Sequence, residues 1–273
     1  MLASAPMPPP ATDPAQAFRR RTVDELTVED ERSFRHVALY AELKEVLRRA
    51  RYPFRVLPEA LEGRADRALL LNLTFWGADA GGDVLESATL PADVVAHAAW
   101  HHLAAKALPH EGKPSVAGLF LGEAIASAFD VYLVGRLLGH APNSSFLETQ
   151  VPAMAEATES AGLDEDGFES MLEAIAADPD RAFADLRELL FDATSALYVA
   201  RDADAATAAL TAFDGHRFAS LLHRYELSNW VLYARAYGDA AGDARARELD
   251  GLLRSEKLAL EWLVREWVTP ALR

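Results

Sequence analysis

Apolar residues recur at steps of three and four over most of the chain, and this spacing predicts a mainly helical protein. Between Ser33 and Ala50 the apolar positions mark one face of a helix. A second helix is expected from Thr89, with Pro91 in its first turn, to about Leu108. The first third of the chain therefore contributes at least two helices.

The remainder of the chain reads as helix after helix. A long apolar helix is expected from near Ser115 to Gly139, a residue suited to a left-handed cap. Asp178-Pro179 has the form of a helix start, and residues 240–268 read as one long amphipathic segment. No strand is expected beyond Gly139.

Two short stretches have a pattern typical of β-strands. They are residues 54–57 (FRVL) and residues 69–76 (LLLNLTFW), the second of which precedes a glycine-rich connection. We expect residues 69–76 to lie beside the helix that starts at Thr89.

These elements predict a mainly α protein with a small β-sheet, of the α+β class. Five prolines precede the first basic residue, so residues 1–30 are expected to form a flexible tail. Residues 31–110 form a small α+β front half and residues 111–273 a helical lobe. No linker separates these two parts, so we expect one continuous globular unit.

Composition and charge narrow the classes of function. The formal net charge of −15 repels phosphate backbones and argues against a nucleic-acid partner. Without cysteine, any metal site must use histidine and carboxylate ligands. No secretory signal and no uncharged apolar stretch of roughly 18 to 20 residues is recognised, so we expect a soluble cytoplasmic protein without a membrane partner.

The candidate chemistry lies in the segment DVVAHAAWHH, residues 93–102. His97 and His101 are one helical turn apart, so both imidazoles can reach one metal ion. Glu123 lies on the next expected helix, where an antiparallel arrangement brings its carboxylate to the two imidazoles. Two histidines, one glutamate and an open position form a catalytic zinc shell, and we expect their donor atoms to converge within about 4 Å.

The same histidine pair has a structural interpretation without metal. A histidine on an apolar helix is more often a satisfied core residue than a ligand. The alternative is therefore a metal-free helical interaction protein, whose His97 and His101 are buried and hydrogen-bonded to backbone.

The segments around these residues resemble the thermolysin-like metallopeptidases, a gluzincin family with the motifs D-V-V-A-H-E-x-x-H and N-E-A-I-S-D. Here the corresponding segments read DVVAHAAWH (residues 93–101) and GEAIASAFD (residues 122–130). Upstream, residues 74–76 (TFW) resemble the end of the family's substrate-pairing edge strand. The resemblance covers about a quarter of the chain. It implies a zincin-like minimal core with Zn²⁺ on His97, His101 and Glu123, a C-terminal helical lobe, and a peptide or protein segment as the ligand.

The main departure from the family follows the first histidine. A zinc peptidase has a glutamate there as general base, and this chain has Ala98, whose methyl group transfers no proton. The resemblance therefore implies a catalytically degenerate homologue, or pseudoenzyme. The alternative is an active metal-dependent hydrolase with another base, for which His102, four residues after Ala98, is the nearest candidate.

Other parts of the family's site are also changed. The family places an aspartate four residues after the ligand glutamate, where it orients the first histidine. This chain has Ser127 there, which can still accept an N–H bond but carries no charge, and Asp130, one turn further, is expected to substitute for the aspartate. In the helical lobe His216, His223 and Tyr225 are candidates for an oxyanion donor, but the sequence around them does not match the family's motif.

Overall fold

The computed structural model describes residues 17–75, 83–109 and 112–273. The strands are β1 (Arg19–Arg21), β2 (Thr27–Glu29), β3 (Phe54–Val56), β4 (Val84–Leu85) and β5 (Thr89–Pro91). The α-helices are α1 (Ala38–Ala50), α2 (Ala65–Phe75), α3 (Ala92–Ala107), α4 (Val116–Leu138), α5 (Ser145–Ser160), α6 (Glu165–Ala177), α7 (Pro179–Val199), α8 (Ala203–Thr211), α9 (Leu227–Tyr237), α10 (Asp243–Ser255), α11 (Ala259–Leu263) and α12 (Thr269–Ala271). Short 3₁₀ segments are η2 (Val23–Glu25), η3 (Ser33–His36), η4 (Glu59–Leu61), η5 (Ala219–Tyr225) and η6 (Ala240–Gly242), and η7 (Val264–Val268) is a π turn.

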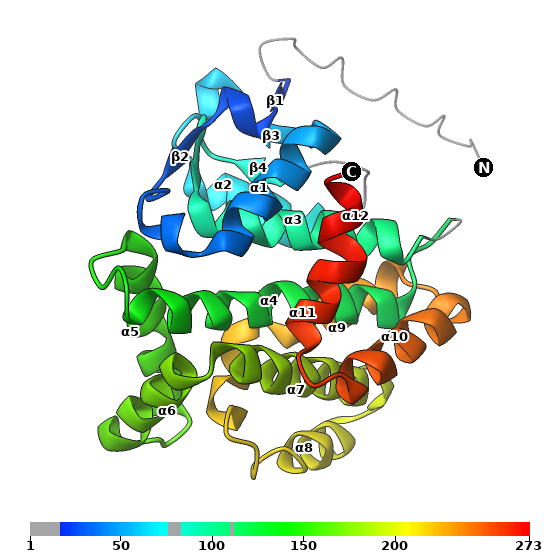
Figure 1. Ribbon diagram of the computed structural model, residues 1–273. Coiled ribbons are helices and arrows are strands. Elements are labelled where there is room, and N and C mark those ends of the chain that lie inside the picture. Colours follow the sequence, from blue (N-terminus) through cyan, green and yellow to red (C-terminus); the bar gives the residue numbers. More distant parts are fainter. Residues whose placement is uncertain (1–16, 76–82, 110–111) are drawn as a thin grey trace, which may run out of the picture.

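The strands form two small sheets beside the helices. One sheet has the order β1-β3-β4, with β1 antiparallel and β4 parallel to β3; the other pairs β2 with β5 in parallel. Figure 1 shows the strands together with α1 and α2 above α3, and α5 to α8 below α4, while α11 and α12 run across α4 toward α3. The expected class, mainly α with a small β-sheet, is confirmed.

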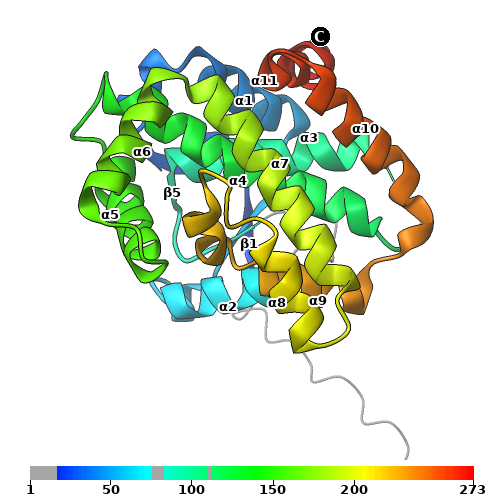
Figure 2. The same ribbon diagram turned by 90° about the horizontal axis from the view of Figure 1, so that it is seen from below.

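Helix α4 is the central element of the fold. Helices α3, α5, α6, α7, α9 and α10 all pack against it, and in Figure 2 α7 crosses it. By length and composition α4 is apolar enough to cross a membrane, but 83% of its most apolar window is buried inside the protein. That burial accounts for the apolar sequence by the packing of a core helix.

Capping explains where α4 begins. The hydroxyl of Ser115 accepts a hydrogen bond from the backbone N–H of Gly118, so Ser115 is the N-cap that the sequence predicted. Asp243 of α10 accepts bonds from the Ser115 hydroxyl at 3.0 Å and the Ala117 N–H at 2.8 Å. Helix α10 thus fixes the end of α4 that lies nearest to Glu123.

The prediction of a strand over residues 69–76 is wrong. Residues 65–75 form α2, and Trp76 lies outside the described residues. Leucine and alanine favour helices, and the run holds no β-branched residue before Thr74, so its apolar character alone did not distinguish strand from helix. Helix α2 buries Ala68 and leaves Leu69 more than half exposed. The resemblance of residues 74–76 to an edge strand is therefore lost.

Part of the predicted tail, residues 17–30, is folded. Residues 19–21 and 27–29 pair in the two sheets, whereas residues 1–16 lie outside the described range. Strand β1 consists of three arginines and has no apolar alternation, so only its backbone pairing with β3 reveals it.

Several predicted helix ends also move. Thr89 belongs to β5, and α3 begins only after its N-cap, Pro91. Gly139 has a φ of −85° and is therefore not a left-handed cap. Residues 240–268 divide into several helices because α10 ends at Ser255. The starts of α4 and α7 agree with the sequence, and Asp178 caps α7 as expected.

Candidate metal centre

Helices α3 and α4 present the three predicted ligands to one another. His97 and His101 lie one turn apart on α3, and Glu123 lies on the antiparallel α4. One donor atom from each residue lies within 4.8 Å of the other two, close to the expected separation of about 4 Å. The three donor atoms therefore converge, though less closely than predicted, and this group could hold a metal ion.

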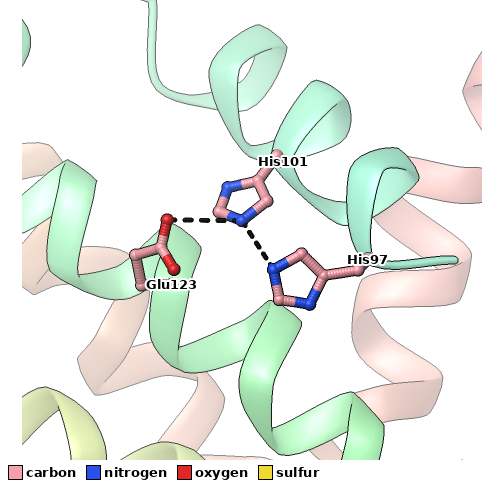
Figure 3. Close-up of side chains that lie close together, drawn as sticks. All are labelled: His97, His101 and Glu123. Carbon is pink, nitrogen blue, oxygen red and sulfur yellow. Dashed lines mark hydrogen bonds and ion pairs between the residues drawn. The ribbon is translucent and has the colours of Figure 1, made fainter. Parts of the chain in front are cut away.

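The orientation of the side chains matches that of ligands. The Nε2 atoms of His97 and His101 lie 3.1 Å apart, and Nε2 of His101 lies 3.3 Å from Oε1 of Glu123 (Figure 3). In a tetrahedral site with metal–nitrogen bonds of about 2.05 Å, ligand atoms are separated by about 3.3 Å. The residues present therefore fit a metal ion of that geometry.

Asp130 faces the ring nitrogen of His97 that does not point at the other ligands. Its Oδ2 lies 3.4 Å from Nδ1 of His97, on the side of the ring opposite to the donor atom Nε2. A carboxylate that accepts a bond from Nδ1–H fixes the orientation of a metal-binding imidazole and raises its basicity. Asp130 thus lies where a carboxylate that orients His97 is expected. Ser127 is buried, and within the described part of the chain no hydrogen bond or ion pair joins it to either histidine.

Accessibility differs among the three residues. The side chains of His97 and His101 are 33% and 30% exposed, whereas Glu123 is 6% exposed. A ligand from solvent can therefore reach the imidazoles, while the carboxylate is held in the interior. Two surface hollows elsewhere, one beside Tyr40 and one beside Met171, do not include the three residues.

Without metal, the two imidazoles share their charge unequally. Burial by itself lowers the pKa of His97, but Asp130, together with Glu123 and Asp83, raises it to about 9. Burial and the neighbouring charge on His97 lower the pKa of His101 to about 3. At neutral pH the metal-free pair therefore carries one positive charge, on His97, and His101 is neutral.

Two further carboxyl groups lie near the cluster. Burial, with a contribution from Asp130, raises the pKa of Asp93 to about 6. Burial also raises the pKa of Asp83, and the charge of His97 opposes that rise. Neither residue is among the ligands or supporting residues expected from the sequence. Asp93 could have been found because it precedes His97 by one turn on the same stripe; no pattern marks Asp83.

His102, the candidate base, lies away from the cluster. Its ring meets Tyr52 edge-on at 5.5 Å, and burial lowers its pKa to about 4. Ala98 is fully buried in the apolar core. Ala98 and His102 thus pack against the core and Tyr52. The structure does not place the His102 imidazole beside His97 and His101.

The candidate oxyanion donors are spread over the lobe. His216 accepts a bond from the Phe218 N–H at 3.1 Å, and His223 is exposed. Burial raises the pKa of the Tyr225 hydroxyl; the charge of Arg224 opposes that rise and the charge of Asp130 adds to it.

Comparison of the chain with protein-family models, with curated proteins and with solved structures found no match. The chemistry of the site therefore rests on the residues themselves.

Proposed function

We propose that this protein binds one zinc ion through His97, His101 and Glu123 and is a catalytically degenerate relative of the gluzincin metallopeptidases. The observation that supports binding is the position of Nε2 of His101, which lies 3.1 Å from Nε2 of His97 and 3.3 Å from Oε1 of Glu123. Two neutral nitrogen ligands favour zinc over calcium or magnesium, which prefer oxygen.

Loss of hydrolysis is proposed from the residue after His97. Ala98 has no group that accepts a proton, its methyl group is buried, and the nearest replacement, His102, packs against Tyr52. Removal of a general base lowers a hydrolytic rate by about 10² to 10⁴. The partly exposed imidazoles remain accessible to a bound ligand, for which we propose a peptide or protein segment.

Metal analysis of protein purified without a histidine tag tests this function. We expect about one zinc per chain in the wild type and almost none in the double variant His97→Ala/His101→Ala. The matched control is His36→Ala/His140→Ala, which removes an exposed pair whose rings lie 5.9 Å apart and which should keep its zinc. A wild type without zinc would refute the proposal and favour the metal-free interaction protein.

An assay on unstructured peptides tests the second half of the proposal. We expect no cleavage that a chelator abolishes. Zinc-dependent cleavage by the wild type, absent from His97→Ala/His101→Ala, would instead establish an active hydrolase with a base other than residue 98.

A further inference from the structure

The outer edge of strand β4 is closed by a side chain instead of by another strand. In the sheet β1-β3-β4, β4 lies at one edge and β3 pairs with its inner side. On the outer side, the Asn72 amide of α2 accepts a hydrogen bond from the Val84 N–H at 2.8 Å and donates to the Val84 carbonyl at 2.9 Å. Just beyond the strand, the Glu86 carbonyl accepts a bond from the Gly63 N–H at 3.1 Å. These bonds satisfy backbone groups that an edge strand otherwise leaves open.

The two bonds to Val84 have the form of a strand pairing. In an antiparallel pair, two opposed residues exchange both of their N–H···O bonds. A carboxamide has a carbonyl oxygen and N–H donors, so the Asn72 side chain exchanges both bonds with one residue in the same way. The carbonyls of Asp83 and Leu85 point the other way, toward β3. The amide thus lies where one residue of an added antiparallel strand would pair.

The part of α2 up to Asn72 buries little apolar surface. Of residues 61–72 only Ala68 is buried, and Leu69 and Leu70 are 59% and 57% exposed. Elements with few buried apolar contacts open at a lower free-energy cost than the core of a protein. On its other side, β4 has a backbone ladder to β3 and a buried side chain, Leu85. Release of α2 therefore costs less than separation of β4 from β3.

We propose that the outer edge of β4 is a binding edge for an extended peptide, which pairs antiparallel with Val84 after the Asn72 amide is released. The peptide is recognised mainly through its backbone, because the groups at this edge are those of the main chain. Helix α2 keeps the edge closed until a peptide replaces it. This inference goes beyond the proposed function and is independent of it, because neither bond to Val84 involves a metal ligand.

Hydrogen exchange followed by NMR on the full chain tests the opening of α2. The Val84 N–H is bonded to Asn72, whereas the Leu57 N–H is bonded across the ladder to the Leu85 carbonyl. We expect the Val84 N–H to exchange at least about tenfold faster than the Leu57 N–H, and Asn72→Ala to accelerate Val84 alone. Asn143→Ala, at an exposed position, is the matched control and should change neither rate. Equal rates for Val84 and Leu57 in the wild type would show that α2 does not open separately from the sheet, and would overturn the proposal.

Binding of a probe tests the edge itself. The probe is a fluorescein-labelled peptide of alternating threonine and valine, whose β-branched residues favour an extended backbone. Because release of the Asn72 amide opposes binding, we expect about tenfold tighter binding by Asn72→Ala than by the wild type or Asn143→Ala, measured by fluorescence anisotropy. A probe N-methylated at every residue has no backbone donor and should not bind to any of the three proteins.

A second variant covers the case in which Asn72→Ala also accelerates Leu57, which would mean loss of the sheet. Asn72→Asp keeps an oxygen for the Val84 N–H but loses the donor to the Val84 carbonyl, so its affinity for the probe should lie between those of the wild type and Asn72→Ala. No gain of binding in either variant, or equal binding of the N-methylated probe, would overturn the proposal. Dimers of Asn72→Ala that exclude the probe would assign the edge to a second copy of the chain and overturn the peptide as its occupant. Each measurement is repeated with a chelator, and a wild type without zinc would refute the proposed function alone.

Discussion

Two helix interfaces of this protein bury charged side chains, and they balance charge in different ways. Between α7 and α10, Arg187 is fully buried and paired with Asp250, which also accepts a bond from Arg254 at 2.8 Å. Arg254 in turn pairs with Asp192 at 2.7 Å. Acidic and basic side chains alternate through this network, so the charge of Arg187 is balanced by neighbouring carboxylates, although its Nε and Nη2 are buried without a hydrogen-bond partner in the described part of the chain.

The interface between α3 and α4 is different. Glu123 faces His101, Asp130 faces His97, and the charges of Asp83 and Asp93 also interact with His97. Among the described residues, the cation that lowers the pKa of Asp83 and Asp93 is the protonated His97. The negative charge at this α3–α4 interface needs a proton or a metal ion to balance it, whereas the charges of the Arg187 network need neither. This difference indicates which interface is structural and which is functional.

Breaking the Arg187 network should have the largest effect. Arg187→Met leaves part of the Asp250 charge without its partner and should lower the free energy of unfolding by about 3 kcal/mol, measured by urea denaturation. The loss should be the same with and without a chelator, because no metal contributes to this interface. Arg265→Met, at an exposed ion pair, is the control and should change stability by less than about 0.5 kcal/mol.

Adding a carboxylate at residue 98, beside the α3–α4 interface, should lower the stability of the protein by a similar amount. Ala98→Glu restores the family's catalytic residue in name, but its side chain would enter a fully buried position without a counter-charge. We expect a loss of about 2 to 4 kcal/mol in unfolding free energy and no gain of peptidase activity. Ala105→Glu, at an exposed position of the same helix, should be harmless. A stable, zinc-loaded Ala98→Glu protein that cleaves peptides would show instead that residue 98 faces an open cleft.

Within the α3–α4 interface, Asp130 is expected to strengthen zinc binding through His97. Asp130→Asn removes the charge that faces Nδ1 of His97 and should weaken zinc binding by about 10- to 100-fold, which corresponds to about 1.4 to 2.7 kcal/mol. Asp166→Asn, an exposed carboxylate of α6, is the matched control for loss of one charge. Equal affinities for the two variants would remove Asp130 from the site.

The smallest effect concerns protons. The pKa of His97 in the metal-free protein is raised to about 9, so at pH 7 this imidazole carries a proton that zinc must displace from Nε2. We expect release of about one proton per zinc at pH 7, and an affinity that rises about tenfold per pH unit until it levels above about pH 9. Calorimetric titrations in two buffers of different ionisation enthalpy measure this number. Binding without proton release would mean that His97 is already neutral, or not a ligand.

The parts of the molecule that the sequence could predict are those with local signals. Ser115 caps α4, Asp178 caps α7, and the one-turn spacing of His97 and His101 places both imidazoles on one face. The spacing from His101 to Glu123 was sufficient to predict the third ligand, because a short connection forces α3 and α4 to run antiparallel. Each of these inferences depends on a few neighbouring residues.

The rest depends on tertiary contacts without a local signal. Residues 69–76 were assigned to a strand because a short apolar run is compatible with either structure, and only packing decides. The backbone of β4 is held by the side chain of Asn72, whose amide both donates to and accepts from Val84. Likewise Asp83 acts on His97 from a loop that carries no recognisable pattern.

X-ray absorption at the zinc edge, on protein loaded with one equivalent of zinc, tests the central claim most directly. The account predicts a four-coordinate ion with two imidazole nitrogens at about 2.0 Å and at least one carboxylate oxygen, and loss of the imidazole signal in His97→Ala/His101→Ala. An ion surrounded by oxygen alone, or an unchanged imidazole signal in that variant, would contradict it.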